Sequence, residues 1–134
     1  MPQDDSAVPK SDTPYARAKR AMIGDRGKGI APDLPKAERL LREAIAAGER
    51  VSSAVKDLSV VMKRMGRAGD AAAMICEMRH LCGDEHQTSL DHMLYDLYTR
   101  SEDFESALAI QERQLKENDK DVVHSSQLVV TGLP

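Results

Sequence analysis

The amino-acid sequence predicts an all-α protein built from about three antiparallel helix pairs. Residues 52–82 contain two apolar stripes with helical spacing, separated by Gly66, which can adopt the positive φ that ends a helix. The first stripe consists of Val55, Leu58, Val61, Met62 and Met65, and the second of Ala71, Ala72, Met74, Ile75, Met78 and Leu81. Neither helix can bury its stripe alone, so we expect further units of the same kind to cover it.

A repeat in the sequence supports this fold class. Ala37, Ala71 and Ala107 are spaced by 34 and 36 residues, and each lies near the start of an apolar helical stripe. A period near 34 residues with two helices per unit is typical of tetratricopeptide repeats, which stack into an α-solenoid. The first helices lack the Trp and Gly usual in such repeats, and an unrelated helical bundle is the alternative.

Composition and charge agree with packed helices. The 134 residues, enough for one domain, include one Phe and no Trp, and no strand-like alternation favours a sandwich or barrel. The net charge of −3 gives no general attraction to nucleic acid or to anionic membranes. No apolar run approaches the length of a bilayer span, and the N-terminus has no secretory or transit pattern.

The N-terminal part begins with a polar leader, residues 1–12, which we expect to be disordered. Thr13-Pro14 places an N-cap and a first-turn proline before a helix that ends at Gly24. The glycine-rich segment 24–33 then predicts a loop. Its Gly27-Lys28-Gly29 lacks the preceding strand, the upstream glycine and the following Ser or Thr of a phosphate-binding loop, so we do not assign it that role.

Five further segments complete the predicted organisation. The expected helices span about residues 34–47, 52–65, 68–81, 89–100 and 104–117. The expected N-caps are Ser52 or Ser53, Thr88 or Ser89, and Asp103, and the last helix is expected to bury Ala107, Leu108 and Leu115. The three pairs would then occupy residues 13–48, 51–83 and 88–118. Residues 119–134 form either a capping segment over the last pair or a docking peptide.

The cysteines and histidines favour a structural role. Cys76 and Cys82 lie six residues apart on one predicted helix, about 9 Å along its axis, which is too far for a disulfide. We therefore expect buried thiols in a reducing compartment, cytoplasmic or nuclear. His80 and His86 could join them in a metal-like cluster, but Cys82 points elsewhere, so we predict no metal and no cofactor.

No set of residues indicates catalysis. Ser89 and His92 lie one helical turn apart on an exposed face, without a third group to orient them. We interpret Asp91, Asp96 and Glu102 as helix caps and solvated carboxylates. The sequence therefore predicts a protein that is not an enzyme.

The first helices of stacked pairs line the concave face, which is the usual binding surface of such solenoids. In this frame the predicted peptide-binding groove consists of Lys56, Val60, Lys63, Arg64, His92, Asp96, Thr99 and Arg100, with Ser53, Ser89, Tyr95 or Tyr98, and Arg17, Lys19 or Arg20 beside it. Its Lys and Arg side chains would hold the carboxylates of an acidic peptide. Ordinary solvated helix faces are the alternative interpretation.

Two other functions remain open at this point. An open end at the last helix would allow self-assembly into a homo-oligomer. An RNA-binding helical repeat has nearly the same unit length, but three units with net negative charge make nucleic acid the less expected partner.

Four segments resemble the plant POLLENLESS or MALE STERILE family of tetratricopeptide proteins, which includes the sulphur-deficiency-induced proteins. They are TPYARAK (13–19), ERVSSAVKDLSVVMKRMGR (49–67), MRHLC (78–82) and SLDHMLYDLY (89–98), and the resemblance spans about residues 13–116. The loop 24–33 is richer in glycine than is usual for the family. The resemblance implies a non-enzymatic scaffold that regulates by binding proteins, in meiotic exit, pollen development or the response to sulphur limitation.

Overall fold

The computed structural model describes the backbone of residues 12–131 and the side chains of residues 12–119. Within this range the chain is all-helical, as predicted, with one isolated β-bridge between Asp25 and Ile30 and no other strand pairing. The helices are α2 (Pro14–Ile23), α3 (Leu34–Ala46), α4 (Val51–Arg64), α5 (Ala68–Met78), α6 (Gln87–Arg100) and α7 (Phe104–Thr131), with short 3₁₀ turns η1 (Arg26–Lys28), η2 (Arg79–Leu81) and η3 (Asp84–His86). The leader predicted for residues 1–12 lies, except for Asp12, outside the described residues.

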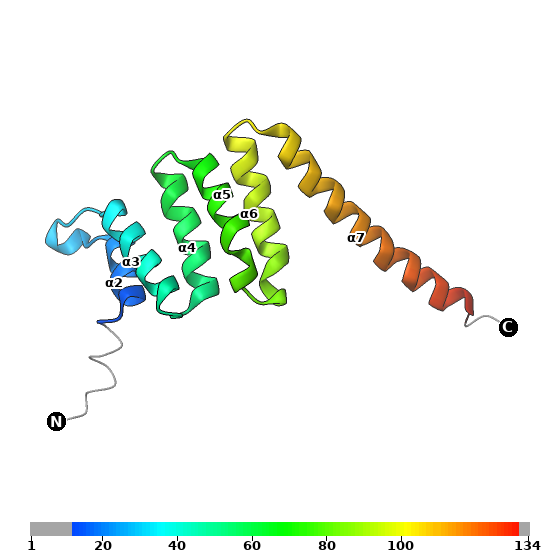
Figure 1. Cartoon of the computed structure of the whole chain (residues 1–134), viewed down its shortest axis with the longest axis horizontal. Helices are drawn as coiled ribbons and strands as arrows, with labels where there is room; N and C mark the ends of the chain where they lie inside the picture. Colours follow the sequence, from blue (N-terminus) through cyan, green and yellow to red (C-terminus); the bar gives the residue numbers. More distant parts are fainter. Residues whose placement is uncertain (1–11, 132–134) are drawn as a thin grey trace, which may run out of the picture.

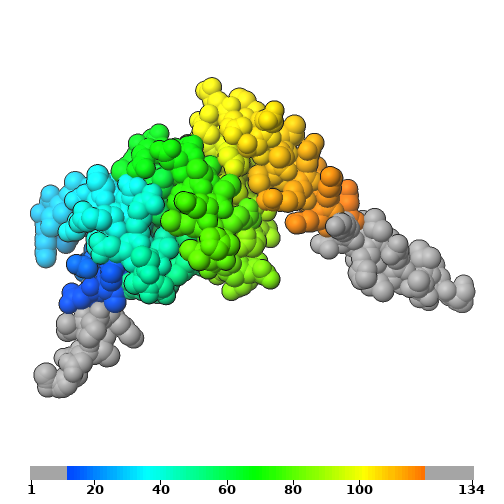
Figure 2. Space-filling view, in the orientation of Figure 1, coloured from blue at the N-terminus to red at the C-terminus, as the bar shows by residue number. Residues whose placement is uncertain are grey.

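The helices form a row in which each packs mainly against its neighbours in the chain (Figure 1). One continuous apolar core runs through the row from α2 to the start of α7, and the row forms a single body (Figure 2). The alanines that define the sequence period, Ala37, Ala71 and Ala107, are all buried, as expected for positions where helices approach closely. The predicted frame of alternating first and second helices is therefore consistent with the packing.

Two of the predicted helix starts are confirmed. The hydroxyl of Thr13 accepts a hydrogen bond from the backbone N–H of Ala16 (3.1 Å), and the carboxylate of Asp103 accepts one from Ser106 (3.2 Å). Both side chains satisfy an N–H that has no partner within the helix.

The caps predicted for α4 and α6 are wrong. The start of α4 is Val51, after Arg50, which has a φ of 47° and stacks over the Tyr15 ring at 5.0 Å. The start of α6 is Gln87, directly after η3, and the side-chain amide of Gln87 donates to the carbonyl of Arg79 (3.0 Å). In each case the helix begins before the expected serine or threonine, at or next to a residue that contacts another part of the chain. Arg50 contacts Tyr15, and Gln87 contacts Arg79.

Several side chains expected in the core are exposed. Leu81 follows the end of α5 within η2, where the 3₁₀ geometry takes it out of the apolar stripe. Leu108 and Leu115 lie on a face of α7 that no described helix covers. Cys76 is also exposed, whereas Cys82 is buried, and both are free thiols.

The last helix is longer than predicted. Instead of ending near residue 117, α7 continues to Thr131, so residues 119–131 extend the same helix rather than forming a separate element. Its ribbon leaves the row at an angle to α6 (Figure 1). The last three residues of the predicted tail, 132–134, lie outside the described residues.

Asp91, predicted to be solvated, is instead a buried ion-pair centre that joins three helices. The residue is 6% exposed, and its carboxylate accepts hydrogen bonds from Arg79 after α5 (2.9 Å) and from Arg113 of α7. A buried carboxylate is costly unless it is paired, so the two arginines are required by its position. The pairs fix the angle at which α7 leaves α6.

We expect Ala71→Leu to destabilise the fold by about 1–3 kcal/mol, because the added methylenes would have to fit at a position that is already fully buried. Urea unfolding followed by circular dichroism measures this change. Ala73→Leu, an exposed change in the same helix, serves as the control and should shift the free energy of unfolding by less than about 0.5 kcal/mol. Equal effects of the two variants would contradict the repeat frame.

Candidate functional site

The predicted groove corresponds to two hollows in the surface. The first, of about 210 Å³, lies between α4 and α6 and is lined by Ser59, Val60, Lys63, His92, Met93, Asp96 and Leu97. The second, of about 300 Å³, lies between α6 and α7 and is lined by His92, Tyr95, Gln111 and Gln114. His92 borders both hollows, and we call them together the interaction groove.

Helical periodicity explains why these side chains meet. Residues 59, 60 and 63 share one face of α4, and residues 92, 93, 96 and 97 share one face of α6, because side chains four residues apart lie one above the other. The floor of the first hollow is closed by Ser59, whose buried hydroxyl donates to the carbonyl of Lys56 (2.7 Å). The hydroxyl therefore has its hydrogen-bond acceptor within its own helix and does not need one from a ligand.

The charges of the groove are largely compensated. Asp96 accepts a hydrogen bond from Lys63 of α4 (3.2 Å) and two from Arg100 of its own helix (3.0 and 3.1 Å). Burial alone would raise the pKa of Asp96, but the hydrogen bonds and charges of Arg100 and Lys63 outweigh it and lower the pKa. The expected basic groove is therefore an ion-pair cluster with a single excess positive charge.

The other predicted groove residues have different surroundings. Lys56 lies 3.0 Å from His86 Nδ1, Arg64 donates to the carbonyl of Met22 at the end of α2 (3.2 Å), and Thr99 donates to the carbonyl of Tyr95 (2.8 Å). None of the three lines either hollow. Thus Val60, Lys63, His92 and Asp96 come together in the groove, with Arg100 attached through Asp96.

Of the residues predicted to lie beside the groove, some pair elsewhere and one lines a hollow. Lys19 pairs with Asp57 (3.2 Å), which also accepts from the hydroxyl of Tyr15 (2.8 Å). Tyr98 lies 3.3 Å from the thiol of Cys76, and burial together with this contact raises the pKa of Tyr98 to about 12. Tyr95, by contrast, lines the second hollow.

Sequence reasoning missed the α7 side of the groove. Gln111 and Gln114 line the second hollow, and the side-chain amide nitrogen of Gln114 is buried with no hydrogen-bond partner among the described residues. The repeat frame places α7 as a second helix, away from the concave face, so no local signal identified these residues. Their amides add hydrogen-bonding groups to those of His92 and Tyr95 in the same hollow.

Two further features, a cluster of metal ligands and a membrane-spanning helix, are absent from the described part of the chain. Among those residues no three His, Cys, Asp or Glu side chains gather as metal ligands would. Nor does any described helix combine the length and apolar character needed to span a bilayer.

We expect the pKa of Asp96 to lie below its ordinary value of 3.8. The carboxylate then stays charged to lower pH in the folded chain than in the unfolded chain. Its ion pairs therefore contribute stability above the unfolded pKa, and this is lost as pH falls through the folded pKa. Side-chain ¹³C NMR titration of Asp96 measures the shift. Lys63→Met should raise the midpoint and Lys116→Met should not; a wild-type midpoint at or above 3.8 would contradict the ion-pair geometry.

Comparison with known proteins identifies relatives in one plant. No family model and no solved structure matches the chain. The chain is 40% identical to Protein POLLENLESS 3 of Arabidopsis thaliana over 109 residues, which are 81% of the chain and 24% of that protein. It is 43% identical to Protein POLLENLESS 3-LIKE 2 of the same plant over 93 residues, 69% of the chain and 20% of that protein.

A second group of relatives matches the same region. Protein SULFUR DEFICIENCY-INDUCED 1 of Arabidopsis thaliana is 37% identical over 110 residues, 82% of the chain and 34% of that protein. The chain thus spans between a fifth and about a third of the length of these relatives. The family resemblance indicated by the four sequence segments is confirmed, because the chain is a homologue of the POLLENLESS 3 and SULFUR DEFICIENCY-INDUCED proteins over most of its own length.

Proposed function

We propose that this chain is a non-enzymatic adaptor that binds a peptide or helix of a regulatory partner protein in the interaction groove. The observation that carries the proposal is the meeting of two hollows at His92, one between α4 and α6 and the other between α6 and α7. The buried alanines at the two repeat intervals support the further proposal that the pairs are tetratricopeptide-like units of an α-solenoid. Relatives named for pollenless plants and for sulphur deficiency favour a regulatory role in a plant, in the cytoplasm or nucleus.

The chemistry of the groove favours a partner held by contact area and hydrogen bonds more than by charge. Val60, Met93 and Tyr95 offer apolar surface, and the side chains of Gln111 and Gln114 line the second hollow with amide groups. A ligand carboxylate would have to compete with Asp96 for Lys63 and Arg100. An amphipathic helix with anchors three and four residues apart fits such a surface.

Introducing negative charge at two exposed groove positions tests this proposal. We expect His92→Glu/Tyr95→Glu to lose a partner that wild type captures from plant extract, because the two carboxylates would occupy both hollows without partners. Capture on beads followed by mass spectrometry measures the loss, and thermal unfolding checks that the variant folds.

The matched control is Ala73→Glu/His80→Glu, which places two carboxylates at exposed positions on α5 and η2. This variant should retain the partner. The groove proposal fails if both variants retain it or if both lose it.

Self-assembly is a second candidate function, favoured by one observation. Phe104, Leu108 and Leu115 are 62%, 54% and 55% exposed, and their spacing places them with Gln111 along one side of α7. We call this side the α7 stripe. No described helix covers the α7 stripe, and a helix of a second copy of the chain is the occupant that this candidate function assigns to it.

We expect self-assembly, if it occurs, to depend on the α7 stripe. Sedimentation velocity over a concentration series should then show a dimer of wild type that Leu108→Glu/Leu115→Glu converts to monomer. Ala109→Glu/Lys116→Glu changes two exposed positions of the same helix off the stripe and should leave the dimer intact. A wild-type monomer at every concentration would remove this candidate.

A further inference from the structure

A pocket of about 440 Å³, larger than either hollow of the groove, lies near the N-terminal end of the row. It is formed by the second half of α2, the loop 24–33 and the start of α3, and we call it the loop pocket. Its floor includes Ala21, Ile30 and Ala31, and its rim carries four cationic side chains, those of Arg17, Arg20, Lys28 and Lys36. It shares no lining residue with the interaction groove.

The loop that forms this pocket is held in place by its own contacts. Asp25 and Ile30 exchange two backbone hydrogen bonds of 2.7 Å, and the N–H of Asp33 donates to the carbonyl of Ala21 in α2 (2.8 Å). Gly24 has a φ of 72°, and a Cβ there would lie 2.5 Å from the carbonyl oxygen of Ile30. The glycine therefore allows the loop to close directly onto the end of α2.

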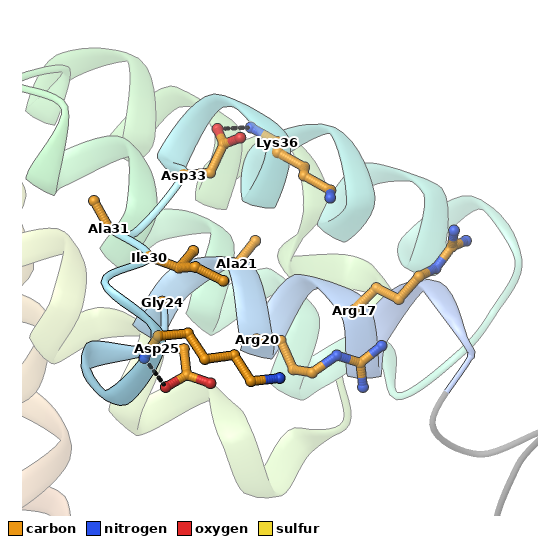
Figure 3. A pocket seen from close by; sticks show the side chains of 10 residues that line it. Arg17, Arg20, Ala21, Gly24, Asp25, Ile30, Ala31, Asp33 and Lys36 are labelled. Carbon is orange, nitrogen blue, oxygen red and sulfur yellow. Dashed lines mark hydrogen bonds between the residues drawn. The ribbon is translucent and has the colours of Figure 1, made fainter.

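These contacts hold an apolar side chain at the surface. Ile30 is 55% exposed although both its N–H and its carbonyl are hydrogen-bonded to the backbone of Asp25. Figure 3 shows Ile30 and Ala21 between the side chains of Arg20 on one side and Lys36 on the other, with Arg17 farther along α2. The pocket thus combines an apolar centre with a cationic rim.

Three of the four cations of the loop pocket differ from Lys63 and Arg100 of the groove in making no side-chain ion pair among the described residues. Arg17, Lys28 and Lys36 stand against the carboxylates of Asp25 and Asp33, which leaves an excess of positive charge among these five residues. Both carboxylates accept from backbone N–H groups, of Lys28 (3.3 Å) and Lys36 (3.1 Å), and act as caps. No ion pair joins the side chains of Arg17, Lys28 or Lys36 to any other side chain within residues 12–119.

We propose that the loop pocket is a second binding site, which takes an acidic segment of a partner protein. An apolar side chain of that segment would pack on Ile30 and Ala21, and its carboxylates would pair with the cationic rim. Charge complementarity selects the ligand, because the cations of this rim are available to carboxylates although the chain as a whole carries a net charge of −3. The inference does not depend on the interaction groove.

Fluorescence anisotropy with a defined probe tests the proposal. The probe is a dye-labelled 12-residue peptide with four glutamates around a central Leu-Phe pair, and a matched probe carries glutamine at the four positions. We expect the Glu probe to bind the full chain about tenfold more tightly than the Gln probe, and to weaken as salt is raised. Equal binding of the two probes would overturn the proposal, as would no binding of either.

Matched charge reversals locate the site. Arg17→Glu/Lys36→Glu should weaken binding of the Glu probe by about tenfold or more. Arg39→Glu/Lys116→Glu makes the same change in net charge at exposed positions outside the pocket and should weaken it by no more than about threefold. Equal losses of affinity in both variants would mean that the probe responds to the net charge of the chain, and this would contradict the proposed site.

Two further measurements separate the remaining alternatives. Ile30→Ser keeps the charges but removes the apolar centre and should weaken the Glu probe by about threefold or more. In ¹⁵N NMR spectra the probe should shift the amides of Ala21 and Ile30, and shifts confined to Val60 and His92 would instead assign the peptide to the groove. Tighter binding of a 12-nucleotide RNA than of the Glu probe, lost in the same variant, would make this a nucleic-acid site and overturn the proposal.

Discussion

Close approach of helix backbones is the constraint on which this structure depends. The chain has no Trp, its single Phe is exposed, and Tyr15 and Tyr98 are only partly buried at the edge of the core. Buried alanines occupy the crossings instead, on α2, α3, α4, α5 and α7. Helices α4 and α6 both pack against α5, and side chains of α4 and α6 meet beside it. The groove with its Lys63–Asp96 ion pair lies where these side chains meet.

Ion pairs add contacts between neighbouring helices to those that the apolar core supplies. Asp91 with Arg79 and Arg113 sets α7 against α6, and the second hollow of the groove lies in the angle between them. Glu38 accepts from Arg67 at the start of α5 (2.9 Å) and also from Arg42 (3.1 Å). Burial would raise the pKa of Glu38, but the hydrogen bonds from Arg67 and Arg42 outweigh it and lower the pKa. The carboxylate therefore stays charged while it joins α3 to the start of α5.

The parts of the fold that could be predicted from the sequence are those with local causes. Thr13, Asp103 and the spaced alanines act through neighbours three to five residues away or through a repeated pattern, and the structure confirms them. The failures have distant causes. Arg50 starts α4 early because it stacks on Tyr15, and Asp91 is buried because arginines from two other elements reach it. No pattern within a single helix contains that information.

The same distinction explains where the positive charge of this protein is available. Lys63 pairs with Asp96 at a separation of 33 residues, and Lys19 with Asp57 at 38 residues, both close to the repeat interval. Lysines of α2 and α4 thus meet acids of α4 and α6, so part of the positive charge on these helices is neutralised by the alternate helix that follows. Arg17 of α2 and Lys36 of α3, which line the loop pocket, have no such pair within residues 12–119. A count of lysines and arginines along the helices therefore does not predict where positive charge is available, because availability depends on which carboxylates the fold brings opposite each cation.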